Sequence, residues 1–175
     1  MTPIIALLAP LLLASSPAPV PLTTGAPLPA LRGELLTGRD VELPGEVRGR
    51  VTLLAFGFSR GASEDVDAWA KRFRGAFGAD TATTWLEVPV MGGTARLMRG
   101  LITGAMRGGT PEADRSHLMT VWGVADEWKH RLGFDRPKPA YVVLLDREGR
   151  VRWRGTGPLD EAKWKQLSEA VEAAR

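Results

Sequence analysis

The sequence of 175 residues contains no cysteine and only two histidines. Without a thiol the chain can form neither a thiolate nucleophile nor a disulfide, so thiol redox chemistry, thiolate metal ligation and a cysteine-linked lipid anchor are excluded. His117 and His130 lie thirteen positions apart and lack the spacing of a His-x-x-x-His pair, so we expect no metal site. We expect no cofactor either.

Positive charge is present but is not organised for nucleic acid. The formal net charge is +3, and four arginines surround one expected hairpin, namely Arg147, Arg150, Arg152 and Arg154. Nucleic-acid binding would require such charges to be joined to stacking aromatic residues in a known motif. No such motif is found, so we interpret the cluster as a solvated basic face and expect no nucleic-acid partner.

The N-terminal apolar run is too short to span a bilayer, which takes roughly 20 residues. Residues 4–14 resemble the core of a secretory signal, whereas mitochondrial transit peptides are rich in arginine, and the first arginine here is Arg32. We expect residues 1–18 to be a signal peptide or apolar anchor, 19–30 a flexible Pro/Ala-rich linker, and 31–175 one domain. The protein is then exported, periplasmic or membrane-associated through this segment; a disordered apolar tail is the alternative.

Hydrophobic periodicity predicts alternating strands and helices in the rest of the chain. Three- and four-residue spacing predicts a helix with Ser63 as N-cap, ending near Gly75 or Gly78. Apolar runs and turn signals predict the remaining elements: a hairpin over 35–43, strands at 51–58, 84–91, 117–121, 141–146 and 151–154, and helices at 94–106, 124–132 and 158–174. This order favours an α/β fold with a mixed sheet covered by helices on both faces.

The segment Val51 to Ser59 ahead of Trp69, and the segment Leu132 to Gly155 with its strand-Asp-x-x-Gly-strand pattern, resemble thioredoxin-like proteins. Within that fold the chain is similar to the mitochondrial ATP synthase assembly-factor family and its bacterial counterparts, which are poor in cysteine. The resemblance implies a thioredoxin-like domain with a chaperone-like role in maturing a membrane complex. It also implies that Pro139 stands where such folds keep a cis-proline, beside an edge that docks an extended peptide. A rigid loop that only starts a strand is the alternative for Pro139.

A second motif points to an enzyme. Gly57-Phe58-Ser59-Arg60-Gly61 matches the nucleophile-elbow pattern between a strand and a helix. A hydrolytic serine needs a base, but too little chain lies upstream for the early strands of a hydrolase, and both histidines precede the strand at Tyr141. A serine-dependent hydrolase using Ser59 therefore stays the alternative to a binding protein.

The expected helix at 94–106 carries a wide apolar stripe beside three arginines. We interpret the stripe as core; if part of it is exposed, a methionine-containing face flanked by arginine could hold a partner helix or lie on a membrane surface. The tryptophans are mostly expected in the core. Trp122 and Trp128, near predicted loop ends, are the better candidates for contact residues.

These observations favour a protein that binds other proteins and is not an enzyme, because the fold signature lacks its reactive thiol. The partner would be a protein client or a subunit of a membrane complex such as ATP synthase. Its binding residues are predicted to be Phe58, Ser59, Arg60, Trp122 and Pro139. An inert module derived from a peroxiredoxin-like domain is a further alternative.

Overall fold

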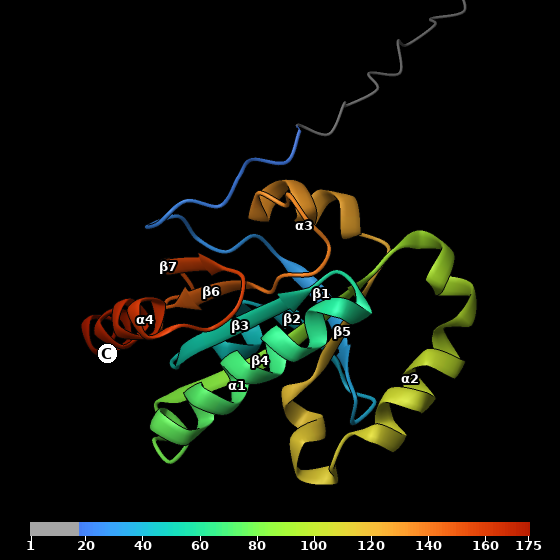
Figure 1. The fold of residues 1–175 in the computed structure, drawn as a ribbon, viewed down its shortest axis with the longest axis horizontal. Coiled ribbons are helices and arrows are strands. Elements are labelled where there is room, and N and C mark those ends of the chain that lie inside the picture. Colours follow the sequence, from blue (N-terminus) through green and yellow to red (C-terminus); the bar gives the residue numbers. More distant parts are fainter. Residues whose placement is uncertain (1–17) are drawn as a thin grey trace, which may run out of the picture.

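The computed structural model describes residues 18–175; the expected signal segment falls almost entirely outside that range. Seven strands form one mixed sheet in the order β2-β1-β5-β4-β3-β6-β7 (Figure 1). The central strands β3, β4 and β5 run parallel, and the outer pairs are antiparallel. The strands are β1 (Leu31–Leu35), β2 (Asp40–Leu43), β3 (Val51–Gly57), β4 (Thr83–Met91), β5 (Met119–Trp122), β6 (Tyr141–Leu145) and β7 (Val151–Thr156).

Helices cover both faces of this sheet, as the sequence predicted. Helices α1 (Ser63–Phe77) and α4 (Glu161–Ala173) pack on one face, and α3 (Ala125–Leu132) packs on the other. All seven residues of β3 are buried, because this strand has neighbours on both edges and helices on both faces. The α/β class expected from the sequence, a mixed sheet with helices on both faces, is confirmed. Among residues 18–175, no helix has the length and apolar character needed to cross a membrane.

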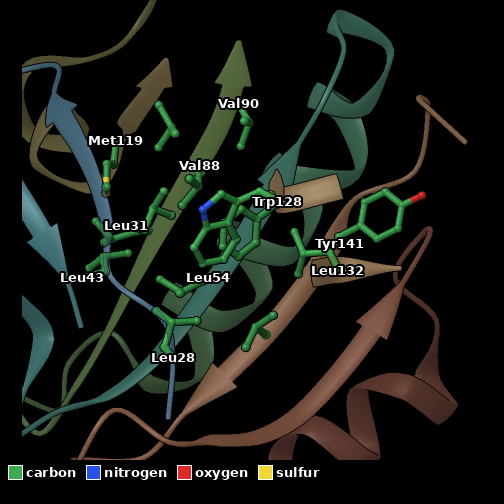
Figure 2. Packing of buried hydrophobic residues seen from close by; sticks show 14 of the residues in the cluster. Leu28, Leu31, Leu43, Leu54, Val88, Val90, Met119, Trp128, Leu132 and Tyr141 are labelled. Carbon is green, nitrogen blue, oxygen red and sulfur yellow. The ribbon is translucent and has the colours of Figure 1, made fainter. Parts of the chain in front are cut away.

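The larger core cluster lies between the sheet and α3 (Figure 2). Trp128 is 1% exposed and its ring stacks on Phe56, with 5.3 Å between ring centroids. The prediction that Trp128 is a contact residue is therefore wrong: the apolar face of α3 turns it into the sheet, where burying so large a ring stabilises the fold.

The Pro/Ala-rich stretch is not a free linker along its whole length. Leu22 and Leu28 are 2% and 3% exposed and belong to the core cluster. The Leu22 N–H donates to the Arg131 carbonyl at 2.8 Å, and the Leu28 N–H donates to the Gly149 carbonyl at 2.9 Å. The packed part of the chain thus begins before Leu31, because two leucines spaced among prolines and alanines suffice to fix the segment on the sheet.

The start of α1 also differs from the prediction. A 3₁₀ turn, η2 (Arg60–Ala62), runs directly into the helix, so Ala62 occupies the N-cap position. The Ser63 hydroxyl donates to the Arg60 carbonyl at 2.8 Å and caps no helix N–H. The helix ends at Phe77, with Gly78 as C-cap, and it passes through Gly75.

The expected helix at 94–106 is divided and largely exposed. A 3₁₀ segment, η3 (Gly93–Met98), precedes α2 (Arg99–Gly109), and Thr103 is the one buried residue of α2. Leu97 is 93% exposed and Leu101 is 69% exposed, so the interpretation of the apolar stripe as core is wrong. Glycine lowers helix propensity by about 1 kcal/mol relative to alanine, and α2 contains four of them, Gly100, Gly104, Gly108 and Gly109. Figure 1 shows α2 standing apart from α1 at the side of the sheet.

Candidate functional site

The turn between β3 and α1 presents Phe58, Ser59 and Arg60 at the end of the central strand. Ser59 and Arg60 are exposed, Phe58 is half-buried, and Ala62 is fully buried. Gly57 fits this turn closely, since a Cβ there would lie 3.3 Å from Val66 Cγ2 and 3.5 Å from the Ala62 Cβ. The turn is therefore a fixed platform that ends in two exposed polar side chains.

Two hydrogen bonds join this turn and α1 to the loop that precedes β6. The Ser59 hydroxyl donates to the Pro137 carbonyl at 2.6 Å, and the Ala140 N–H donates to the Asp65 carboxylate at 3.3 Å. Pro139 lies between these two links and is buried. It therefore positions the loop beside the turn and does not itself offer a contact surface.

Among residues 18–175, the one cis peptide bond joins Leu43 to Pro44. The bond before Pro139 is thus trans, which differs from what the family resemblance implied.

Aromatic packing supports the turn from below. The Phe58 ring meets the Phe134 and Tyr141 rings edge to face, with centroid distances of 5.3 Å and 5.7 Å. The Tyr141 hydroxyl lies 2.7 Å from the Asp135 carboxylate. Burial raises the pKa of Tyr141, and the hydrogen bond from this hydroxyl lowers the pKa of Asp135, so the tyrosine acts as a neutral donor that fixes the 134–137 loop.

The same geometry does not assemble a serine hydrolase. The Gly-x-Ser-x-Gly segment does lie between a strand and a helix, but the Ser59 proton is directed to a backbone carbonyl. His117 stacks on Trp85 with 3.8 Å between centroids, and its Nδ1 lies 3.0 Å from the Trp85 carbonyl. His130 is exposed on α3, which packs on the opposite face from α1. A base hydrogen-bonded to the serine, which activation requires, is not found among the described residues.

Trp122, at the end of β5, does not join the turn. It is half-buried and lines a separate hollow of about 530 Å³ with Arg32, Glu42 and Arg99. The Arg99 guanidinium lies over its ring, 5.8 Å from the centroid. The structure thus groups Phe58, Ser59, Arg60 and Pro139, and it leaves Trp122 apart from them.

A groove of about 710 Å³ begins at this turn and continues between α1 and α2. Its lining includes Phe58, Ser59 and Arg60 from the turn, and Glu87, Pro89 and Met91 from β4. Sequence analysis missed Glu87. The available signal was a carboxylate between two apolar residues, Leu86 and Val88, in the predicted strand at 84–91. Burial, with contributions from Asp67 and Asp114, raises the pKa of Glu87 to about 7.

The fold and this turn define a thioredoxin-like domain that has no thiol. Three solved structures illustrate the similarity. A candidate protein disulfide isomerase from Bacteroides thetaiotaomicron is 18% identical, with a TM-score of 0.60 over 87% of this chain and 90% of that one. The exposed lipoprotein thioredoxin of Streptococcus pneumoniae is 17% identical, with a TM-score of 0.53 over 81% and 99% of the two chains. BsSco, of the Sco family of cytochrome c oxidase assembly proteins, is 11% identical, with a TM-score of 0.57 over 89% and 96%.

The family follows from the sequence match. Residues 24–173 match the family described as ATP10 protein, and the chain belongs to that family. The resemblance to the ATP synthase assembly factors is thereby confirmed, and with it an assembly-related role. No curated protein matches the chain.

Proposed function

We propose that this protein is a non-catalytic assembly factor that binds a protein client, a subunit of a membrane complex such as ATP synthase, at the turn Phe58–Arg60. The observation that carries the proposal is the state of the turn: where thioredoxin-like enzymes use a thiol at the start of a helix, this chain has Ser59 bonded to a backbone carbonyl and a buried Ala62. Such a turn has no reactive group, but its surface is exposed and rigid.

The side chains of the turn suit contact with a protein. Phe58 is partly exposed, and its ring is packed on Phe134 and Tyr141, so little conformational entropy is lost when a partner covers it. Arg60 is exposed and forms no ion pair within residues 18–175. Aromatic and arginine side chains contribute strongly to protein interfaces. Export of the protein, predicted from residues 1–18, belongs to the same proposal.

Crosslinking in the native cell tests this function. A photo-reactive amino acid placed at position 60 should give one or a few discrete protein adducts, which mass spectrometry would identify as subunits of a membrane complex. The matched control is the same photo-reactive group at Glu148, an exposed position in the β6–β7 turn. If the position-60 adducts are no different from those at position 148, the turn does not bind a client.

A further inference from the structure

Helix α2 has an apolar face that the protein covers only in part. Its Ile102, Ala105 and Met106 line the groove. Leu101 on α2, and Leu97 and Met98 at the end of η3 directly before it, are 69%, 93% and 54% exposed. Among the described residues, four large hydrophobic side chains are exposed: these three and Val20. Exposed apolar side chains therefore lie next in sequence to the α2 residues that line the groove.

Two arginines hold α2 at a distance from the body of the domain. The Arg99 guanidinium pairs with Glu34 on β1 at 2.6 Å, and Arg107 Nε donates to the Leu36 carbonyl at 2.8 Å. Each link fixes one end of the helix, while its apolar face is covered only in part. The groove is thus formed before any partner arrives, which lowers the conformational cost of binding.

The floor of the groove contains one carboxylate. Glu87 is half-buried on β4 and has no hydrogen-bond or ion-pair partner within residues 18–175. The two cations that act on its charge are already engaged, because Lys71 pairs with Asp67 at 2.9 Å and Arg74 pairs with Asp114 at 2.9 Å. A buried carboxylate without a partner is unfavourable, and a cation brought to it from outside would relieve that cost.

The position of the groove indicates which shape of partner fits. Its floor is the face of the sheet, and β4 is already hydrogen-bonded to β3 and β5 on its two edges, so an added strand would find no free edge there. A helix, in contrast, can pack on the face of the sheet next to α1, in the same way that α1 packs on it. A flat bilayer would not reach the floor of a concave groove, so it would leave Glu87 without a partner.

We propose that this groove binds an apolar helical segment of the client protein, and that one lysine or arginine of that segment pairs with Glu87. The inference rests on the proposed function and adds the chemistry of the client to it. Leu97, Met98 and Leu101 form the outer rim of the binding surface, and the side chains of the client helix interdigitate with Ile102 and Met106, as in other complexes of a helix in a groove.

Synthetic helical peptides test the proposal on the purified protein. The probe is a labelled peptide of about 18 residues, or five turns, built from leucine and alanine, with polar ends and one central lysine; matched peptides carry leucine or glutamate at that position. Fluorescence anisotropy should show that the lysine peptide binds about tenfold more tightly than the leucine peptide, and that the glutamate peptide binds most weakly. Glu87→Gln should abolish the preference, so that the lysine and leucine peptides bind with similar affinity, whereas Glu148→Gln, on the exposed β6–β7 turn, should keep the preference of the wild type.

Substitutions in α2 give a second readout. Ile102→Asp should abolish binding of all three peptides, and circular dichroism would confirm that this variant folds. If it does not fold, the second variant is Leu101→Asp on the exposed rim, which should weaken peptide binding at least tenfold. Equal affinity of the lysine and leucine peptides would overturn the proposal. It would also be overturned if the protein bound none of the peptides but bound phosphatidylglycerol vesicles, and if Leu97→Asp abolished that vesicle binding. If the peptide tests fail but client adducts still form at position 60, the proposal that the groove binds a helix is refuted and the assembly function is not. If those adducts do not form, the proposed function itself is refuted.

Discussion

The Ser59 hydroxyl donates a hydrogen bond to the Pro137 carbonyl at 2.6 Å, and the two residues are 78 positions apart in the sequence. This bond joins the turn after the central strand to the loop before β6, and it occupies the hydroxyl that a hydrolase would need. Ser59→Ala should lower the free energy of unfolding by about 1 kcal/mol, the usual net value of one hydrogen bond, as measured by urea denaturation. A fluorophosphonate probe should not label the wild-type protein; labelling that disappears in Ser59→Ala would support the hydrolase instead.

The turn should accept a disulfide if it has the geometry of a thioredoxin. Ser59 is exposed and Ala62, three residues later, is fully buried at the start of α1, the arrangement of a Cys-x-x-Cys pair. The double variant Ser59→Cys, Ala62→Cys should form an internal disulfide on mild oxidation, and the thiol at position 59 should have a lowered pKa because it lies beside a helix N-terminus.

Thiol titration before and after oxidation measures this, and the two single variants are the controls. A folded double variant that keeps both thiols free under oxidation would mean that the turn differs from that of the redox relatives.

Glu87 should make the stability of the protein depend on pH. Burial raises its pKa to about 7 in the folded protein, from an ordinary 4.5, so between these values the folded state binds more protons than the unfolded state. The free energy of unfolding therefore falls as pH rises through this window. One pKa unit corresponds to about 1.4 kcal/mol; because Glu87 is only half-buried, we expect a loss of about 1–2 kcal/mol from pH 5 to pH 8.

Glu87→Gln should remove this part of the pH dependence, and Glu148→Gln should retain it. Urea unfolding at the two pH values gives the comparison. Identical pH profiles for wild type and Glu87→Gln would show that Glu87 titrates as an exposed carboxyl.

Leu22 should matter to stability although it lies in a Pro/Ala-rich segment. Its side chain is 2% exposed, its N–H donates to Arg131, and its carbonyl accepts a hydrogen bond from the Arg154 guanidinium. Leu22→Ala should destabilise the protein by about 2–3 kcal/mol, at the low end for a buried leucine because the site is at the edge of the core. Val20→Ala, at a position 69% exposed, should have an effect within about 0.5 kcal/mol. Equal effects of the two substitutions would restore the interpretation of this segment as a linker.

Most of the sheet was predictable because its signals are local. The buried strand before Phe58, the Asp-x-x-Gly hairpin between β6 and β7 and the apolar spacing of α1 each depend on adjacent residues, and the order of the elements then determines the class of fold. The turn at Phe58, Ser59 and Arg60 could be identified for the same reason, since it follows the central strand directly.

The parts that were missed depend on contacts between distant residues. The exposure of Leu97 and Leu101 follows from the absence of any element packed over α2 within residues 18–175, and an amphipathic pattern cannot distinguish that case from burial. The anchoring of Leu22 needs Arg131 and Arg154, and the isolation of Glu87 needs Lys71 and Arg74 to be paired elsewhere. None of these relationships is visible at short range along the sequence.

Rescue of complex assembly in cells that lack this protein tests most directly whether it works by binding and not by chemistry. Native gel electrophoresis of solubilised membranes would measure the amount of assembled ATP synthase after each variant is expressed at equal levels. We predict that Ser59→Ala restores assembly as fully as the wild type, and that Arg60→Glu, which reverses the charge on the exposed turn, does not. A folded Ser59→Ala protein that fails to restore assembly, beside an Arg60→Glu protein that succeeds, would contradict the account.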